Sequence, residues 1–368
     1  MVLSMNACFF VDSDRQATNS DIKARPVVGA IRWDAWHNPD KGSAAREVER
    51  SLSPKKYHWR APFFSEILSD TAIRIKGYTQ EVVDQEIEYA SEMGLDYWAF
   101  LLYDEHSALS DGLNYYLDSK IKNKIKFCAM VTPSRSFGSK GTELERLVRY
   151  FKEPSYLMIA GNRPLIYFFR PTPEWVSTMG GENVVKEELG MLTKKTKEAG
   201  YGEPYIVVMH YDQTIGLQMF DLLEADALSD YAIGGDNGAE GNDYVRLMKQ
   251  SEVFWDKYKE SGHTLVPTIM TGWDRRPRIE NPVSWELEQK QGKGMDKYFE
   301  APTTKELIHH FMQAMEWANK KNSADQAKIV LVYAWNEHDE GGWLCPTLNE
   351  DGAINTERLE AVKKVLGN

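Results

Sequence analysis

The fold is decided by residues 329–341, which read IVLVYAWNEHDEG. The first five form an apolar, largely β-branched run, typical of a strand buried on both faces in a parallel sheet. Polar residues follow, among them Glu337 and Glu340, and Gly341 then lets the backbone turn. Carboxylates at the carboxyl end of a buried strand are typical of α/β enzymes. The alternative for this pair alone is structural, with Glu337 capping the next segment and Glu340 solvated in a loop.

Composition narrows the class of protein. The chain has 368 residues, 42% hydrophobic and 27% charged, which is enough for one large domain or two small ones. Its net charge of −11 argues against nucleic-acid binding, because an acidic surface repels phosphate. No apolar run approaches the ~18 residues of a membrane helix, so no membrane span is predicted.

Neither a metal nor another cofactor is predicted. The cysteines, Cys8, Cys128 and Cys345, lie far apart and lack metal-type spacing. The eight histidines are scattered, whereas metal hydrolases built on barrels need clustered His and Asp ligands. The chain also has no G-x-S-x-G nucleophile elbow and no lysine at the end of a predicted strand.

Residues 1–24 are predicted to form a flexible segment. Residues 2–10 are weakly apolar without a preceding basic residue, a poor match to a signal peptide. Residues 12–21 are polar, as in chains that are disordered in isolation. We expect a soluble protein of unknown compartment, and export to a bacterial periplasm stays open.

From residue 25 onward, strand-like segments alternate with helix-like ones. The predicted strands are 27–33, 95–103, 125–131, 164–169, 205–210, 225–229, 265–270 and 329–335. Eight strands alternating with helices predict an α/β fold, a single (β/α)₈ TIM barrel over residues 25–368. A doubly wound open sheet is the competing architecture, but the G-x-G-x-x-G turn it favours is absent.

Two connections are longer than ordinary βα loops. Residues 34–77 follow the first predicted strand, and residues 271–302 follow the seventh. Because βα loops usually span only a few residues, we predict long insertions at the first and seventh strand-to-helix connections.

The predicted strands end in aromatic, acidic, amide, His and Arg side chains. In a barrel the carboxyl ends of all the strands lie on one face, so these side chains should lie together. Aromatic rings can stack on sugars, while carboxylates, amides, His and Arg bind hydroxyl groups. We therefore predict a carbohydrate site with Glu337 and Glu340 as catalytic residues, since glycoside hydrolysis needs a proton donor and a base or nucleophile. The predicted substrate-binding residues are Trp33, Asp34, Trp36, Tyr103, His210, Trp273, Asp274, Arg275, Trp335 and Asn336. Further polar strand ends are Arg135, Arg170, Asp230 and Tyr231. Singly, each is more often a structural residue, so the prediction depends on the collection.

Three segments together resemble a known family. Residues 334–341 with Pro346-Thr347, residues 272–278 with the pattern GWDxxPR, and residues 162–171 resemble motifs of the glycoside hydrolase family 99-like proteins. That family includes endo-α-mannosidases and bacterial relatives from polysaccharide gene clusters. The chain departs from its pattern at His338-Asp339, where the family usually has Trp followed by Gly or His.

The resemblance implies a (β/α)₈ barrel with a retaining, metal-independent reaction and no enzyme nucleophile. One glutamate would take the proton of the substrate's 2-hydroxyl, which attacks the anomeric carbon to give a 1,2-anhydro sugar. The other would protonate the leaving group. Motif position makes Glu337 the base and Glu340 the acid, whereas the residues themselves leave the roles open.

The sequence therefore predicts a mannosidase-like glycoside hydrolase acting on an oligosaccharide or polysaccharide. One alternative is a glycosyltransferase-like enzyme of polysaccharide biosynthesis, which would bind a nucleotide sugar. Another is a non-catalytic glycan-binding barrel. The sugar, its linkage, endo or exo action and the oligomeric state stay open.

Overall fold

The structure, a computed structural model, describes residues 25–133, 142–234, 242–286, 294–321 and 327–367. The predicted flexible segment 1–24 and the predicted strand-end residue Arg135 lie outside this described part of the chain.

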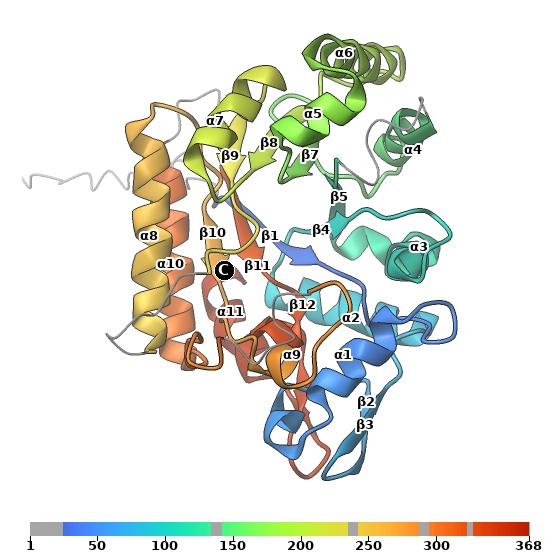
Figure 1. The fold of residues 1–368 in the computed structure, drawn as a ribbon, viewed down its shortest axis with the longest axis vertical. Helices are drawn as coiled ribbons and strands as arrows, with labels where there is room; N and C mark the ends of the chain where they lie inside the picture. The colour runs from blue at the N-terminus through green and yellow to red at the C-terminus, as the bar shows by residue number, and fades with distance from the viewer. Residues whose placement is uncertain (1–24, 134–141, 235–241, 287–293, 322–326, 368) are drawn as a thin grey trace, which may run out of the picture.

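Eight parallel strands form a nearly closed barrel (Figure 1). They are β1 (Val27–Arg32), β4 (Tyr97–Leu101), β5 (Lys126–Val131), β7 (Arg163–Phe169), β8 (Tyr205–Met209), β9 (Ala227–Ser229), β10 (Thr268–Met270) and β11 (Ile329–Tyr333). The hydrogen-bonded order is β10-β11-β1-β4-β5-β7-β8-β9. Between β9 and β10, the backbone N–H of Leu228 donates to Thr264 O, and that of Val266 donates to Leu228 O, each at 2.9 Å. The predicted (β/α)₈ TIM barrel is confirmed.

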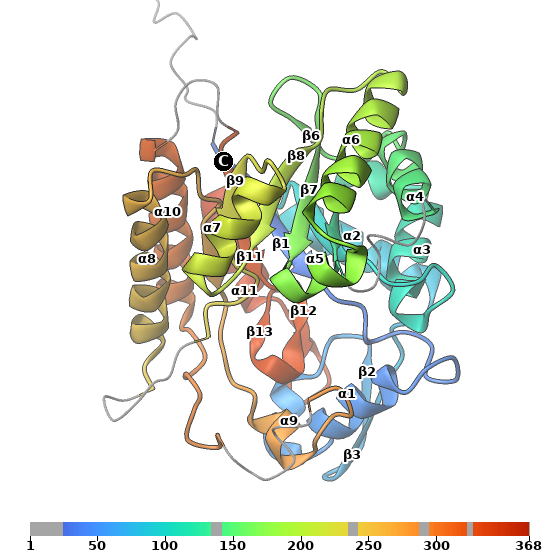
Figure 2. The same cartoon turned by 45° about the horizontal axis from the view of Figure 1, so that its top comes forward.

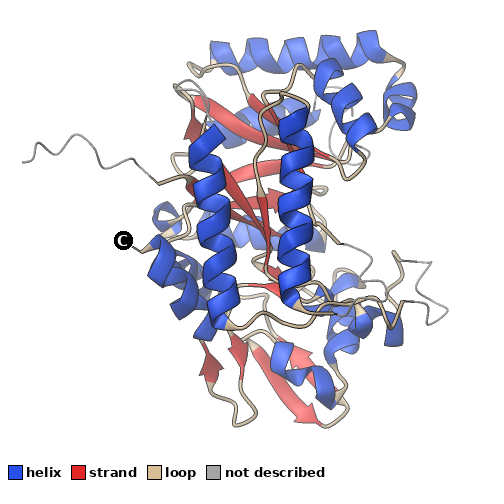
Figure 3. Cartoon of the chain, turned by 90° about the vertical axis from the view of Figure 1, so that its left-hand side faces the viewer, coloured by secondary structure: helices blue, strands red, loops and turns tan. Residues whose placement is uncertain are grey.

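Helices alternate with these strands and cover the barrel. They are α2 (Gln80–Met93), α3 (Asp111–Asp118), α4 (Thr142–Phe151), α5 (Pro173–Met179), α6 (Glu182–Glu198), α7 (Gln213–Leu222), α8 (Tyr244–Glu260), α10 (Thr304–Lys321) and α11 (Glu357–Leu366). The long helices α8 and α10 run side by side on one flank (Figure 3). No helix in the described residues combines the length and apolar composition that crossing a bilayer requires.

The interior of the barrel is filled by large side chains. Tyr97 of β4 and Tyr167 of β7 meet with their hydroxyl oxygens 2.8 Å apart. Gly29 of β1 leaves the space that the Tyr97 ring occupies, since a Cβ at that position would overlap the ring. Every residue of β11 is buried. The strands β1 and β10 pair with its two edges, and α10 packs against it. The polar residues after β11 therefore emerge at the carboxyl end of the barrel.

Two segments distant in sequence pack together beside the barrel (Figure 2). The chain between β1 and α2 holds α1 (Ala44–Leu52), the 3₁₀ helix η1 (Lys55–Arg60) and the hairpin of β2 (Ser65–Ser69) and β3 (Ala72–Ile75). The chain between β10 and α10 holds α9 (Arg276–Glu280). Glu47 of α1 accepts hydrogen bonds from the backbone and the hydroxyl of Ser284. Both segments leave the carboxyl ends of their strands, so together they frame that end of the barrel.

The remaining elements are short. They are β6 (Met158–Ile159), β12 (Asn336–Glu337), β13 (Gly342–Trp343), β14 (Thr347–Leu348), β15 (Ile354–Asn355) and the 3₁₀ helices η2 (Ala108–Ser110), η3 (Lys122–Lys124) and η6 (His338–Glu340). The antiparallel pair of β12 and β13 carries Glu337, and η6 carries Glu340.

Candidate active site

The two glutamates lie on a tight turn after β11. Glu337 pairs with Gly342 across β12 and β13, and Gly341 has a left-handed backbone with φ of 89°. A Cβ at Gly341 would lie 2.5 Å from the backbone nitrogen of Asp274, and a Cβ at Gly342 would overlap the Tyr333 ring. Glycine is therefore required at both positions, and the turn is held against the ends of β10 and β11.

Glu337 and Glu340 line one cavity of about 480 Å³. Six aromatic residues share its wall, namely Trp33, Tyr103, Phe169, Trp175, Tyr231 and Trp285. Two guanidinium groups, those of Arg170 and Arg278, complete its charged lining. A concave, largely aromatic pocket with a few convergent polar groups is the usual form of a small-molecule site.

Glu337 is held by a neutral donor. Its side chain is buried, and the Tyr231 hydroxyl donates to Oε1 at 2.6 Å. The nearest guanidinium nitrogen, Nη2 of Arg278, is 3.4 Å from Oε2. Burial and the charge of Glu340 raise the pKa of Glu337 well above its usual range, and the attraction of Arg278 does not offset them. Glu337 is therefore the carboxyl of this pair that keeps its proton longer as the pH rises.

Glu340 is held by cations. Arg278 and the Tyr333 hydroxyl donate to its two oxygens, and Nε of Arg275 lies 3.4 Å from Oε1. Burial alone would raise the pKa of Glu340, but Arg278 and Arg275 lower it to about 2. Glu340 is therefore ionised over the whole physiological range of pH.

Arg278 organises the acidic cluster. It donates to Asp339 from Nε at 2.7 Å and from Nη2 at 3.1 Å, and to Glu286 from Nη1 at 2.9 Å. Asp339 also accepts from the hydroxyl of Ser51 at 3.3 Å, so this buried carboxylate fixes Arg278 in place. The cation of Arg278 also lies 5.0 Å from the centre of the Trp33 ring. This one positive charge is shared among several carboxylates, so its removal would leave buried negative charge without a partner.

Of the predicted substrate-binding residues, Trp33 and Tyr103 line the cavity. Nε1 of Trp33 donates to the Tyr103 hydroxyl at 2.9 Å, which fixes the indole in one orientation. The Trp33 ring also meets Trp285 edge to face, with centroids 5.6 Å apart. These residues form a rigid aromatic wall beside the two carboxyls.

Four predicted residues next to this wall do not line the cavity and hold the scaffold instead. Asp34 is bonded to Arg32 at 2.9 Å. Trp36 donates to Asn336 O at 2.9 Å. The Asn336 side chain accepts a hydrogen bond from the backbone N–H of Trp33 at 3.0 Å, so it helps to position Trp33 in the cavity wall. Trp335 donates to Glu86 at 2.8 Å in the core.

The other four also lie outside the cavity lining. Asp274 is paired with Arg60 and Arg276, which fixes the loop after β10. His210 accepts from the backbone N–H of Asp212 at 3.0 Å. Trp273 packs beside Tyr333, with ring centroids 5.7 Å apart. Arg275 does not line the cavity itself but contacts Glu340, which does.

Several cavity residues were not among the predicted site residues. Two of them could have been found from the sequence. Tyr231 follows a predicted strand, and Arg278 ends the GWDxxPR motif. Trp285 could not have been found in this way, because it lies within a long connection without a periodic hydrophobic pattern. Among the described residues, no group of three or more His, Cys, Asp or Glu side chains is arranged to hold a metal ion.

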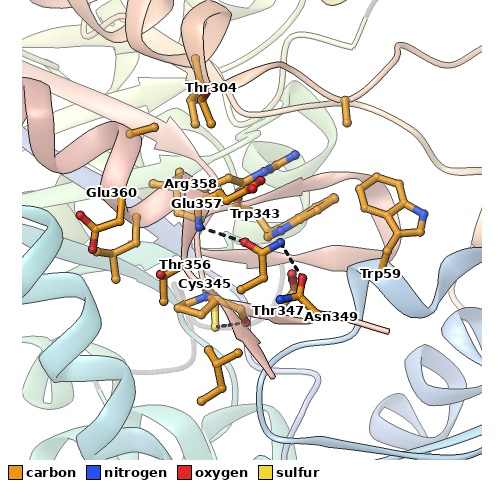
Figure 4. A pocket seen from close by; sticks show the side chains of 18 of the residues that line it. Trp59, Thr304, Trp343, Cys345, Thr347, Asn349, Thr356, Glu357, Arg358 and Glu360 are labelled. Carbon is orange, nitrogen blue, oxygen red and sulfur yellow. Dashed lines mark hydrogen bonds between the residues drawn. The ribbon is translucent and has the colours of Figure 1, made fainter. Parts of the chain in front are cut away.

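A larger hollow of about 830 Å³ lies elsewhere (Figure 4). It is lined by Trp59, Trp343, the hairpin of β14 and β15, and the first turns of α10 and α11. Arg358 is stacked over the Trp343 ring at 3.8 Å and donates to the Trp343 carbonyl at 2.6 Å. Neither Glu337 nor Glu340 lines this hollow, so the chemistry places the candidate active site in the smaller cavity.

Comparison with known proteins gives a likeness of fold. No family model and no curated protein matches the chain. Among solved structures, it is similar to the GH99 endo-alpha-mannosidase from Bacteroides thetaiotaomicron, at 14% identity over 92% of this chain and 96% of that one, with a TM-score of 0.52. The same enzyme in complex with BIS-TRIS-propane aligns at 15% identity over 93% and 96%, with a TM-score of 0.53. At these identities the likeness shows the fold alone.

Proposed function

We propose that this chain is a glycoside hydrolase that cleaves an oligosaccharide or polysaccharide, with residues 25–368 as one catalytic domain. The observation that carries the proposal is that two carboxyls line one aromatic cavity and that their surroundings shift their pKa values in opposite directions. The pKa of Glu337 is raised by burial, and that of Glu340 is lowered to about 2 by Arg278 and Arg275 against the effect of burial. Acid–base catalysis of glycoside cleavage needs one protonated and one ionised carboxyl side by side.

In the reaction we propose, Glu337 donates its proton to the glycosidic oxygen as that oxygen leaves the anomeric carbon. Glu340 accepts the proton of the attacking hydroxyl. These roles are opposite to those implied by motif position, which makes Glu337 the base. We favour the reversed assignment because two cations stabilise the charge on Glu340, whereas Glu337 accepts its shortest hydrogen bond from the neutral hydroxyl of Tyr231.

For the attacking group we propose the substrate's own 2-hydroxyl, as the family resemblance implies, which makes the reaction retaining and mannosidase-like. A substrate with fluorine or hydrogen in place of this hydroxyl should then react slowly with the intact enzyme. Normal turnover of a 2-deoxy substrate would show that water, or the carboxylate itself, attacks the anomeric carbon.

The aromatic wall supports a sugar as the ligand. Trp33 is locked by its bond to Tyr103, and Trp285 stands against it edge to face. Rings that are fixed before the ligand arrives lose little conformational freedom on binding. The wall therefore offers a prepared apolar surface next to the reacting carboxyls.

A panel of defined glycans tests the proposed function. The wild-type protein should release reducing ends from at least one member, and the double variant Glu337→Gln/Glu340→Gln should lose that activity by more than the ~10²–10⁴ of one acid or base. Glu198→Gln, an exposed change on α6, is the matched control and should leave the rate unchanged. Full activity in the double variant would place the reaction elsewhere.

A further inference from the structure

The two guanidinium groups of the cavity are in opposite situations. Arg278 is buried and bonded to carboxylates. Arg170 is exposed and makes no hydrogen bond or ion pair from its side chain to any described residue. Asp230 is the nearby carboxyl whose ionisation Arg170 favours, yet it is buried, accepts from the backbone N–H of Tyr231 at 2.7 Å, and forms no ion pair with Arg170. Within the described residues, the guanidinium of Arg170 therefore lines the cavity without a salt bridge or a hydrogen bond.

The position of Arg170 is nevertheless well defined. Its backbone is left-handed, with φ of 50°, a conformation uncommon for a residue with a side chain. Its N–H donates to Met209 O at 2.9 Å, which ties the end of β7 to β8. Strained backbone persists where the surroundings enforce it, and such positions cluster at functional sites.

Aromatic rings also hold the guanidinium itself. Its carbon lies 5.3 Å from the centre of the Phe169 ring and 5.0 Å from that of Tyr211. Tyr211 is in turn stacked on His210, with centroids 5.0 Å apart. Stacking engages the face of a guanidinium and leaves the N–H groups at its edge free. That edge matches the oxygens of a carboxylate or sulfate, which arginine binds through two parallel hydrogen bonds.

We propose that Arg170 binds an anionic substituent of the glycan, so that the substrate is an acidic sugar bearing a carboxylate or a sulfate. This inference rests on the proposed function, since it names the substrate class for the same cavity. It makes Arg170 a specificity-determining residue that touches the substrate away from the carboxyl pair. The chain's net charge of −11 repels acidic glycans at long range, so a fixed cation inside the cavity is the local attraction such a substrate needs.

Equilibrium binding tests this without turnover. Uronate-containing oligosaccharides are compared with the same molecules after carboxyl reduction, and sulfated oligosaccharides with their desulfated forms. The full-length wild-type protein should bind one anionic class about ten- to a hundredfold more tightly than its neutral counterpart, the usual effect of a charge-assisted hydrogen bond. Arg170→Gln should bring this ratio close to one, and Arg170→Lys should keep part of it. Arg74→Gln, an exposed change on β3, should keep all of it.

Every outcome bears on the inference. A wild-type protein that prefers the neutral forms, or binds no anionic glycan, overturns it, as does an Arg170→Gln variant that keeps the preference. Preferential binding of nucleotide sugars also overturns it and supports the glycosyltransferase alternative. Selective binding of acidic glycans without hydrolysis leaves the role of Arg170 standing and contradicts the proposed function, so the two failures are distinguishable.

Discussion

Glu337 and Glu340 line the same cavity, and their pKa values are displaced in opposite directions. Burial raises both pKa values, but Arg278 and Arg275 together outweigh it at Glu340, whereas Arg278 alone does not at Glu337. Arg278 donates to Oε1 of Glu340, and Nε of Arg275 lies 3.4 Å from the same oxygen. Among the described residues, Glu337 has one such cation, Arg278, with Nη2 3.4 Å from Oε2. The two carboxyls thus differ in proton affinity before any substrate binds.

The first expectation concerns the dependence of kcat/KM on pH. Because the pKa of Glu340 is about 2 in the folded protein, the acidic limb should lie far below the 4.5 of an ordinary glutamate. The alkaline limb should follow the deprotonation of Glu337, whose pKa is raised by burial and by Glu340. Arg275→Gln should move the acidic limb upward, since it removes one of the two stabilising charges. An acidic limb that stays in place in this variant would contradict the role given to Arg275.

The second concerns stability against pH. A carboxyl whose pKa is depressed on folding contributes stability above its unfolded pKa, and loses it as the pH falls through the folded value. Glu340 should therefore contribute to stability above about pH 4.5, and this contribution should vanish towards pH 2. Urea unfolding of the wild type and Glu340→Gln at pH 6, 4 and 3 measures it. The difference in unfolding free energy should shrink as the pH falls, and a difference that grows would have the wrong sign.

The third concerns Arg278. Its removal leaves Asp339 as a buried carboxylate without its main partner, so Arg278→Gln should cost roughly 3–5 kcal/mol of unfolding free energy. The exposed change Arg74→Gln should stay within about 0.5 kcal/mol. Denaturant melts at neutral pH measure both. A loss below about 1 kcal/mol for Arg278→Gln would mean that the acidic cluster does not depend on this cation.

The fourth compares two partly exposed indoles. Trp285, 38% exposed, lines the cavity with the carboxyls, and Trp59, 44% exposed, lines the larger hollow. Trp285→Ala should raise KM roughly three- to tenfold, as expected for one aromatic contact, with little change in kcat. Trp59→Ala should leave KM unchanged. The reverse result would move substrate binding to the larger hollow.

The fifth concerns metal. We propose that proton transfer between Glu337, Glu340 and the sugar needs no ion. Activity should therefore survive exhaustive chelation. Loss of activity in EDTA with recovery on adding a divalent cation would contradict the proposal.

The barrel could be predicted because its signals are local. The run of residues 329–333 is apolar at every position, which a strand covered on both faces requires, and β11 lies there. Helix α2 likewise begins after Thr79, whose hydroxyl accepts from Val82 N, and ends at Gly94 with φ of 88°. Each signal depends on near neighbours in the chain, so sequence alone contains it.

The site could be predicted only in part, because strand-end position does not determine where a side chain points. Trp33 and Asp34 are neighbours, yet Trp33 lines the cavity while Asp34 is bonded to Arg32. Trp285 lines the cavity through its place beside Ser284, which Glu47 of a distant segment holds. A contact between two long connections produces no repeating hydrophobic pattern in the sequence, so it could not be predicted.

The measurement that tests the central claim most directly compares Glu337→Gln and Glu340→Gln on a natural glycan and on an aryl glycoside with an activated leaving group. If Glu337 is the acid, Glu337→Gln should lose about 10²–10⁴ in kcat/KM on the natural glycan and far less on the aryl glycoside, whose leaving group needs little protonation. Glu340→Gln should be impaired on both, because the attacking hydroxyl keeps its proton in either case. Rescue of Glu340→Gln rather than Glu337→Gln by the activated substrate would reverse the roles, and full activity of both variants on the natural glycan would contradict catalysis by this pair.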